Sequence, residues 1–216
     1  MMFNMRLVSY FIVIASFISS SFSANGQSYE DLLKAAQEGQ VKVVERLLDR
    51  GADPDTADAA GYTLLMIAAR QGHEALAVLL VDRKASVRRR SSHGDSALMM
   101  AALGGRLPIV ELLVARGAEL NHPGWTPLHY AAFEGRTDVI GLLLERGAEK
   151  DAVAPNGYSA LMLAARGGHA DAARVLLYKD ADFRVIGPNG ETALSIASKG
   201  EKREVVELLK RAGAVR

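Results

Sequence analysis

The chain has 216 residues, of which 49% are hydrophobic and 24% charged, and its formal net charge is +1. This composition is that of a folded protein rather than a disordered one, and the balanced charge lacks the basic excess typical of nucleic-acid binding. The sequence contains no cysteine, which excludes disulfide bonds, thiolate catalysis and zinc sites with cysteine ligands.

Residues 1–24 have the layout of a secretory signal peptide. Arg6 is the only charged residue, an apolar run extends from Leu7 to Ile18, and a serine-rich segment ends at Ala24. The run is shorter than the ~20 residues of a membrane span, so we expect cleavage after Ser23 or Ala24 and no membrane segment afterwards. An uncleaved signal anchor is the alternative.

The leader predicts export. The leader is short and the chain has no Asn-x-Ser/Thr acceptor site, which favours a bacterial periplasm over secretion to the cell exterior.

Residues 25–216 repeat one unit, and the repeat predicts a single elongated domain. Paired alanines recur at intervals of 33 or 30 residues, with a glycine after each pair and, from the second unit on, a glycine before it; a leucine pair follows, and Gly-Ala ends most units. The first alanines of these pairs are Ala35, Ala68, Ala101, Ala131 and Ala164. We expect six repeats, at about 28–57, 58–90, 91–120, 121–153, 154–186 and 187–216.

Each unit reads as two helices and a turn. A serine or threonine before the alanine pair is expected to cap the first helix, and Pro127 suits the first helical position of the fourth unit. The glycine after the pair, from Gly39 in the first unit to Gly200 in the last, is expected to end that helix in a left-handed conformation. The leucine pair marks the buried side of the second helix. Since neither helix buries its apolar face alone, the units should stack into a solenoid.

Three features depart from the regular pattern. Lys84 and Asp180 stand where glycine is expected after the second helix. The gap between Gly117 and Gly124 is three residues shorter than its counterparts, which predicts a truncated finger between the third and fourth units. The last helix, around Lys202 to Arg211, has a polar outer face, as a terminal repeat needs.

The stretch "GWTPLHYAA", Gly124 to Ala132, together with the later Leu-Leu and Gly-Ala steps, resembles the ankyrin repeat. The resemblance extends from about Tyr29 to Ala214, although only the fourth unit reads Thr-Pro-Leu-His. It implies an all-α solenoid of helix-turn-helix units with short β-hairpin fingers. It also implies a non-enzymatic module that binds a partner protein through the concave face.

The histidines are better explained by structure than by chemistry. His129 is implied by the resemblance to tie its helix to a neighbouring loop, and its counterparts (Met66, Met99, Met162 and Ser195) cannot transfer protons at neutral pH. His73 and His169 lie three repeats apart, and His93 and His122 lack the further ligands that zinc requires. Without a phosphate-binding loop or nucleophile elbow, we expect no enzyme, no metal and no cofactor.

The resemblance places a variable surface at the finger bases and after each alanine pair. The candidate partner-binding residues there are Tyr62, Arg70, Gln71, Asp95, Leu103, Trp125, Phe133, Glu134, Tyr158 and Arg166. Aromatic residues and arginine dominate binding energies at interfaces, which favours binding. The alternative is that Trp125 and Phe133 fold over the shortened finger and cover their own scaffold.

Further alternatives stay open at this stage. The run from Arg88 to Arg90 is either a solvated loop or a docking point for an acidic partner, and three charges are too few to indicate nucleic acid. For the whole protein we expect a monomer that binds one unidentified protein. A self-associating structural scaffold and, least favoured, an enzyme are the competing functions.

Overall fold

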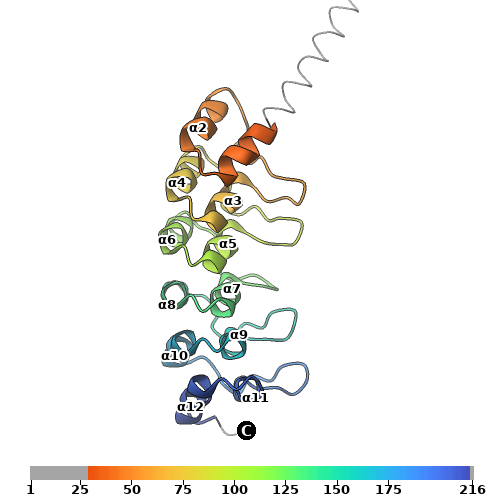
Figure 1. Ribbon diagram of the computed structural model, residues 1–216, viewed down its shortest axis with the longest axis vertical. Helices are drawn as coiled ribbons and strands as arrows, with labels where there is room; N and C mark the ends of the chain where they lie inside the picture. Colours follow the sequence, from red (N-terminus) through yellow and green to blue (C-terminus); the bar gives the residue numbers. More distant parts are fainter. Residues whose placement is uncertain (1–28, 215–216) are drawn as a thin grey trace, which may run out of the picture.

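The computed structural model of the protein describes residues 29–214. The predicted signal peptide, residues 1–24, lies outside the described residues. Figure 1 shows an elongated stack of helix pairs with loops projecting to one side. Within residues 29–214 no helix has the length and apolar character that crossing a membrane requires.

The helices form two columns. Residues 29–37 are helical and pair with α2 (Val41–Asp49). The following pairs are α3 (Leu64–Gln71) with α4 (Glu74–Asp82), α5 (Ala97–Gly104) with α6 (Leu107–Ala115), α7 (Pro127–Phe133) with α8 (Thr137–Glu145), α9 (Ala160–Gly167) with α10 (Ala170–Tyr178), and α11 (Ala193–Lys199) with α12 (Arg203–Arg211). We call the column of residues 29–37, α3, α5, α7, α9 and α11 the inner column and the other the outer column (Figure 1). Helices contact their neighbours within each column, which is the predicted all-α solenoid.

The predicted serine and threonine caps are confirmed. Each cap residue has an extended backbone, and its hydroxyl accepts a hydrogen bond from the backbone N–H three residues later. These residues are Thr63, Ser96, Thr126, Ser159 and Thr192. Pro127 is the first residue of α7, as predicted. A cap of this kind contributes about 1 kcal/mol, so each inner helix begins at a position that the sequence sets locally.

One continuous hydrophobic core extends from Leu32 to Ala214. The paired alanines are buried in the first five inner helices, and their small size permits close approach of neighbouring helices. In the outer column one leucine of each pair is fully buried from α4 onward: the second in α4, α6, α8 and α12, and the first, Leu176, in α10. Full burial of a leucine side chain contributes about 1.5–3 kcal/mol, so the stack depends on contacts that no single unit makes.

The predicted glycine at the end of the inner helix is correct for five units and wrong for the last. Gly72, for example, caps α3 with φ 87°. In the last unit Gly200 has φ −83°, and Glu201 adopts the left-handed conformation with φ 55°. A spacing of 33 residues from Gly168 leads to Glu201, so the last unit places a residue with a Cβ where its neighbours place glycine.

Lys84 and Asp180 keep the left-handed backbone that glycine adopts elsewhere. Their φ values are 69° and 61°, compared with 94° for Gly51 at the equivalent turn. A left-handed conformation costs a residue with a Cβ about 1–2 kcal/mol. The stack therefore imposes the turn geometry even where the sequence does not favour it.

The fingers connect through a ladder of side-chain hydrogen bonds. The Asp55 carboxylate accepts from the backbone N–H of Ser86 at 2.8 Å, and Asp151 accepts from Asp182 at 2.7 Å. Single antiparallel bridges close three fingers, at Ala57 with Thr63, Arg90 with Ser96 and Val153 with Ser159. The finger between α6 and α7 is shorter and narrower than its neighbours in Figure 1, as its residue spacing predicts.

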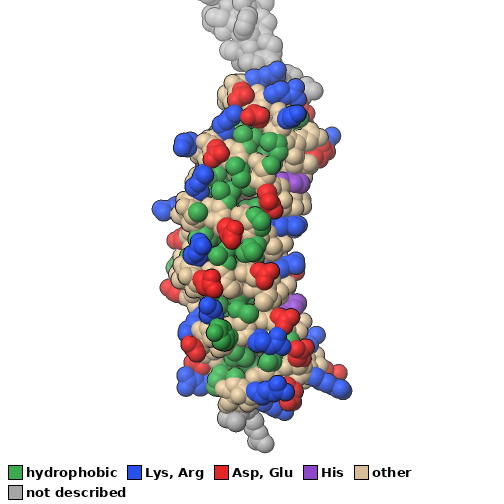
Figure 2. Space-filling view, turned by 90° about the vertical axis from the view of Figure 1, so that its left-hand side faces the viewer, with side chains coloured by type: hydrophobic (Ala, Val, Ile, Leu, Met, Phe, Trp, Pro, Cys, Tyr) green, Lys and Arg blue, Asp and Glu red, His purple; other side chains and the backbone are tan. Residues whose placement is uncertain are grey.

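The outer column carries charges along its whole height, interspersed with hydrophobic side chains (Figure 2). A ladder of ion pairs joins the end of one outer helix to the residue that follows the next. Its members are Asp49 with Arg83 at 2.7 Å, Asp82 with Arg116 at 3.3 Å, and Glu145 with Lys179 at 3.5 Å. Exposed pairs of this type contribute at most about 1 kcal/mol each.

Candidate partner-binding surface

The candidate residues lie on one side of the stack, which we call the inner face: the exposed ends of the inner helices and the bases of the fingers. Their exposure differs from what the sequence predicts. Exposed residues are Arg70, Gln71, Phe133 and Arg166; partly buried residues are Tyr62, Leu103, Trp125, Glu134 and Tyr158; and Asp95 is buried. Fewer of the candidate residues are thus fully exposed than the sequence predicts.

The geometry of Asp95 disfavours the prediction that this residue contacts a partner. Its residue is only 7% exposed, and its carboxylate accepts hydrogen bonds from the hydroxyls of Tyr62 at 2.7 Å and Tyr130 at 2.6 Å. The bond from Tyr62 to Asp95 raises the pKa of Tyr62. Burial, together with the bond to Asp95, raises the pKa of Tyr130. Asp95 therefore joins three successive units internally.

Trp125 packs largely against its own scaffold. Its ring centroid lies 5.9 Å from that of His129, in an edge-to-face arrangement, and 5.6 Å from that of Tyr130. These contacts support the alternative in which Trp125 packs on its own scaffold, although the residue is still partly exposed. Phe133 differs, because it is 47% exposed.

Tyr158 and Arg166 form a second group on the inner face. The Tyr158 hydroxyl donates to Glu191 at 2.9 Å, which raises the pKa of Tyr158 and lowers the pKa of Glu191. The guanidinium carbon of Arg166 lies 6.0 Å from the centroid of the Tyr158 ring, within cation–π range. Lys199 donates to the same Glu191 at 3.4 Å.

His129 has the structural role that the resemblance implies. It is buried; its Nδ1 lies 3.1 Å from the backbone nitrogen of Thr126, and its Nε2 lies 2.9 Å from the carbonyl oxygen of Ala152 in the next finger. The donor at Thr126 makes Nδ1 the acceptor, so the proton sits on Nε2. Burial lowers the pKa of His129, and both nitrogens are engaged, so the ring has no free position for proton transfer.

His73 and His169 link adjacent inner helices. The Nε2 of His73 lies 3.0 Å from the carbonyl oxygen of Gln37, and that of His169 lies 3.0 Å from Phe133. A Cβ placed on Gly135 would lie 2.6 Å from the His169 ring, so the glycine makes room for this link. Across residues 29–214 no cluster of three or more His, Asp or Glu side chains is arranged to hold a metal ion.

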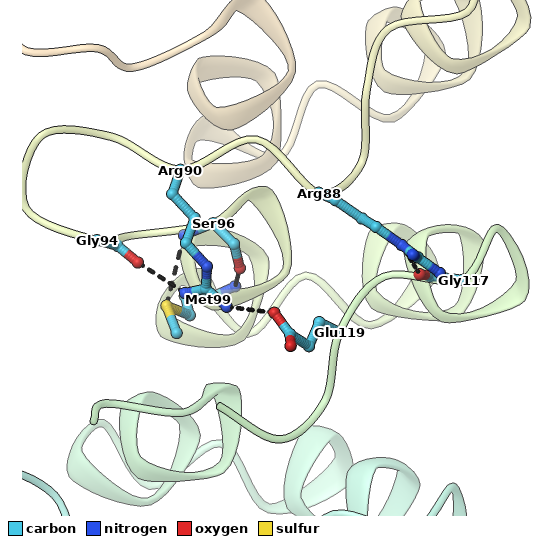
Figure 3. Close-up of polar contacts among 7 residues, drawn as sticks. All are labelled: Arg88, Arg90, Gly94, Ser96, Met99, Gly117 and Glu119. Carbon is cyan, nitrogen blue, oxygen red and sulfur yellow. Dashed lines mark hydrogen bonds and ion pairs between the residues drawn. The ribbon is translucent and has the colours of Figure 1, made fainter. Parts of the chain in front are cut away.

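The arginine run contributes to contacts between fingers (Figure 3). Arg88 donates to the carbonyl of Gly117 at 3.1 Å. Arg90 donates to the carbonyl of Gly94 at 2.8 Å and to Glu119 at 2.7 Å, and the latter bond lowers the pKa of Glu119.

Arg89 lies 3.5 Å from a carboxylate oxygen of Asp55. The three guanidinium groups therefore already have acceptors within the stack, which favours a scaffold role over an acidic docking point.

The sequence interpretation did not single out two contributors to the inner face, Tyr130 and Glu191. Tyr130 occupies the position that other inner helices fill with aliphatic residues, such as Met100 and Leu163. That single polar substitution in an apolar series is the signal that could have revealed the buried acceptor at Asp95.

Comparison with known proteins agrees with this architecture. The family model for ankyrin repeats matches in three copies, at residues 32–123, 90–154 and 149–215. The crystal structure of the human ASB11 ankyrin repeat domain is similar to this chain with a TM-score of 0.80 and 26% sequence identity, covering 85% of this chain and 84% of that one. A search of curated proteins found no match. On the family match and this architecture, the chain belongs to the ankyrin repeat family.

Proposed function

We propose that this protein is a non-enzymatic module that binds one partner protein through the inner face, between α3 and α9. Ankyrin repeats generally mediate protein–protein interaction. The observation that carries the proposal is the exposed Phe133 beside Leu103 on adjacent inner helices, with Arg70 and Arg166 further along the same row. Exposed apolar surface that is rimmed by polar residues marks contact sites.

Binding should depend on a few residues rather than on the whole face. Aromatic residues and arginine supply most hot spots at protein interfaces, and Phe133, Arg70 and Arg166 are exposed on this face. Trp125 and Tyr158 contribute the part of their surface that their internal contacts leave open. Asp95 acts by holding Tyr62 in place.

Self-association through the ends is the competing proposal, and the residues at both ends disfavour it. Asp31 and Lys34 are exposed in the first helix, at the positions where the next inner helix buries Leu64 and Ile67. At the other end the exposed side of α12 carries charged residues such as Glu207 and Lys210. Polar end surfaces prevent further units from stacking, which supports a monomer.

An enzyme is the least supported function. The one histidine in the family motif, His129, is buried with both nitrogens engaged. We propose no cofactor, no nucleic acid and no membrane partner for the folded domain.

We propose that the protein is exported and acts in a bacterial periplasm, with secretion as the alternative. The support is the sequence of residues 1–24, with its single charge at Arg6 and its short apolar run. Mass spectrometry of the protein from a periplasmic fraction tests this. A mature chain beginning at Ala24 or Asn25 is the expected result, and an intact Met1 in the cytoplasm would contradict it.

Affinity capture from an envelope fraction tests the binding proposal. Phe133→Ala should lose the captured protein, whereas Val78→Ala, which truncates a similarly exposed residue on α4 of the outer column, should retain it. Equal capture by both variants would contradict binding through the inner face.

A further inference from the structure

The residues that follow the alanine pairs, with their counterpart in α11, form one row along the inner column, and all of them except the partly buried Leu103 are exposed. In chain order the row is Gln37, Arg70, Leu103, Phe133, Arg166 and Lys199. Two apolar residues stand at its centre, and cationic residues stand on both sides of them. Successive members come from neighbouring inner helices, which pack about 8–10 Å apart. The order of these residues in the chain is therefore also their order along the length of the stack.

Each of the two arginines of the row has a tyrosine hydrogen-bonded to an acid in its own part of the stack. Arg166 lies against the ring of Tyr158, whose hydroxyl is held by Glu191. Three units earlier, Arg70 is close enough to Tyr62 to lower its pKa by its charge, and the hydroxyl of Tyr62 is held by Asp95. In both groups the acid accepts a hydrogen bond from the tyrosine hydroxyl, and Arg166 contacts the tyrosine ring rather than the carboxylate.

Neither arginine has an ion pair among residues 29–214. Arg70 and Arg166 are both exposed and are absent from the salt bridges of the described stack, whereas the nearby acids are engaged: Glu134 pairs with Arg136 at 3.6 Å, and Glu191 pairs with Lys199. A guanidinium presents a planar set of donors that matches a carboxylate in a bidentate pair. The inner face therefore presents two unpaired carboxylate-binding groups with an apolar patch between them.

From this geometry we infer that the partner contributes an extended segment with an apolar centre and a carboxylate side chain, Asp or Glu, on each side. Arg70 and Arg166 bind the carboxylates, and Leu103 and Phe133 contact the apolar centre. The two arginines are three units apart, or roughly 30 Å at the usual helix spacing, which an extended segment of about nine residues spans. This inference rests on the proposed function, because it specifies the chemistry of the same face.

Selection from a phage library of random 16-residue peptides tests the inference with defined probes. The baits are the wild type, the charge-reversed variant Arg70→Glu/Arg166→Glu, and the apolar variant Leu103→Ser/Phe133→Ala. Arg50→Glu/Arg211→Glu is the matched control, because it changes net charge equally at exposed outer-column positions. Circular dichroism melting confirms that each bait is folded before selection.

We expect peptides selected by the wild type to carry Asp or Glu on both sides of apolar residues. The matched control should select the same peptides, and the charge-reversed variant should not. Synthetic copies with Asn and Gln in place of the acids should bind at least about tenfold more weakly, because both charge-assisted pairs are lost.

The other outcomes distinguish failure of the acidic-segment inference from failure of the proposed binding function. Selected peptides that require Leu103 and Phe133 but have no acidic bias, or that bind equally after conversion of their acids to amides, would overturn the inference and leave the proposed function in place. A phosphoserine peptide that binds where its Asp or Glu version does not would also overturn it. If the apolar variant selects every peptide that the wild type selects, the proposed function itself is contradicted.

Discussion

The hydroxyl of Tyr130 donates a 2.6 Å hydrogen bond to the carboxylate of Asp95, which lies 35 residues earlier in the chain and one unit away in the stack. The other carboxylate oxygen accepts from Tyr62, in the unit on the opposite side. One buried acid thus holds three units in register. Side-chain links of this kind add to the apolar contacts between units, which alone have little directional preference.

Replacing this acid should destabilise the stack without changing its helices. Asp95→Ala leaves the hydroxyls of Tyr62 and Tyr130 without their acceptor, and we expect the free energy of unfolding to fall by about 2–3 kcal/mol, because hydrogen bonds to a charged acceptor are lost. Urea denaturation followed by circular dichroism measures the effect. Asp95→Asn keeps one amide oxygen as acceptor, so its stability should lie between those of the wild type and Asp95→Ala. Equal stability of all three proteins would contradict the link.

His129 should make the stability of the folded protein depend on pH. Burial lowers its pKa below the ordinary value, so the unfolded chain takes up a proton more readily than the folded one. The stability contributed by the neutral ring is complete above the unfolded pKa of about 6.5. It is lost as the pH falls below 6.5 towards the folded pKa, because a second ring proton would face the N–H of Thr126.

The comparison with His129→Met isolates this effect, because methionine occupies the same position in three other units. At pH 8 the variant should be less stable by about 1–3 kcal/mol, since the carbonyl of Ala152 loses its donor. The difference between wild type and variant should shrink as the pH falls from 6.5. Chemical denaturation at a series of pH values measures this, and a constant difference would count against it.

Glycine at the left-handed turn after α4 should stabilise the protein. Lys84→Gly relieves a φ of 69°, and the relief of about 1–2 kcal/mol is partly offset by the greater freedom of glycine in the unfolded chain. We expect a net gain of about 0.5–1 kcal/mol.

The matched control for this substitution is Lys42→Gly, which places the same residue inside α2. Glycine in a helix costs about 1 kcal/mol relative to alanine, so the control should lose stability. Thermal unfolding of both variants gives the signs directly, and a lower melting temperature for Lys84→Gly would show that this turn is unstrained.

Substitution of Trp125 should mainly lower stability, whereas substitution of Phe133 should mainly weaken partner binding. Trp125→Ala removes packing against His129 and Tyr130 and should cost about 2–3 kcal/mol of stability. Phe133→Ala, at a residue that is 47% exposed, should change stability by less than about 1 kcal/mol while weakening partner binding. Melting temperatures and partner affinities of both variants, measured together, check the distinction.

The regular features of the fold could be predicted from sequence because they are local. The hydroxyl of Thr63 and the ring of Pro127, at the first position of its helix, determine where helices begin through contacts within a few residues. The buried leucines follow helical spacing. Gly200 lies one residue before the position that the period of 33 residues gives for the left-handed turn, which is Glu201. Tertiary stacking forces Glu201 into the turn, and local preference does not reveal that.

The candidate surface was less predictable because it depends on contacts between units. Asp95 occupies a position that other units fill with Tyr62, Trp125 or Tyr158, and its burial depends on Tyr130 in the next unit. The three arginines from Arg88 to Arg90 were ambiguous for the same reason, since each has an acceptor in a neighbouring unit. Sequence position predicts a candidate face, whereas cross-unit contacts decide which residues remain free on it.

Hydroxyl-radical footprinting of the protein with its captured partner tests the central claim most directly. Phe133 on the inner face and Tyr178 at the end of α10 in the outer column are both exposed aromatic residues, at 47% and 82% exposure. Binding through the inner face predicts that the partner lowers the oxidation of Phe133 and leaves that of Tyr178 unchanged. Protection of Tyr178 with undiminished oxidation of Phe133 would contradict the account.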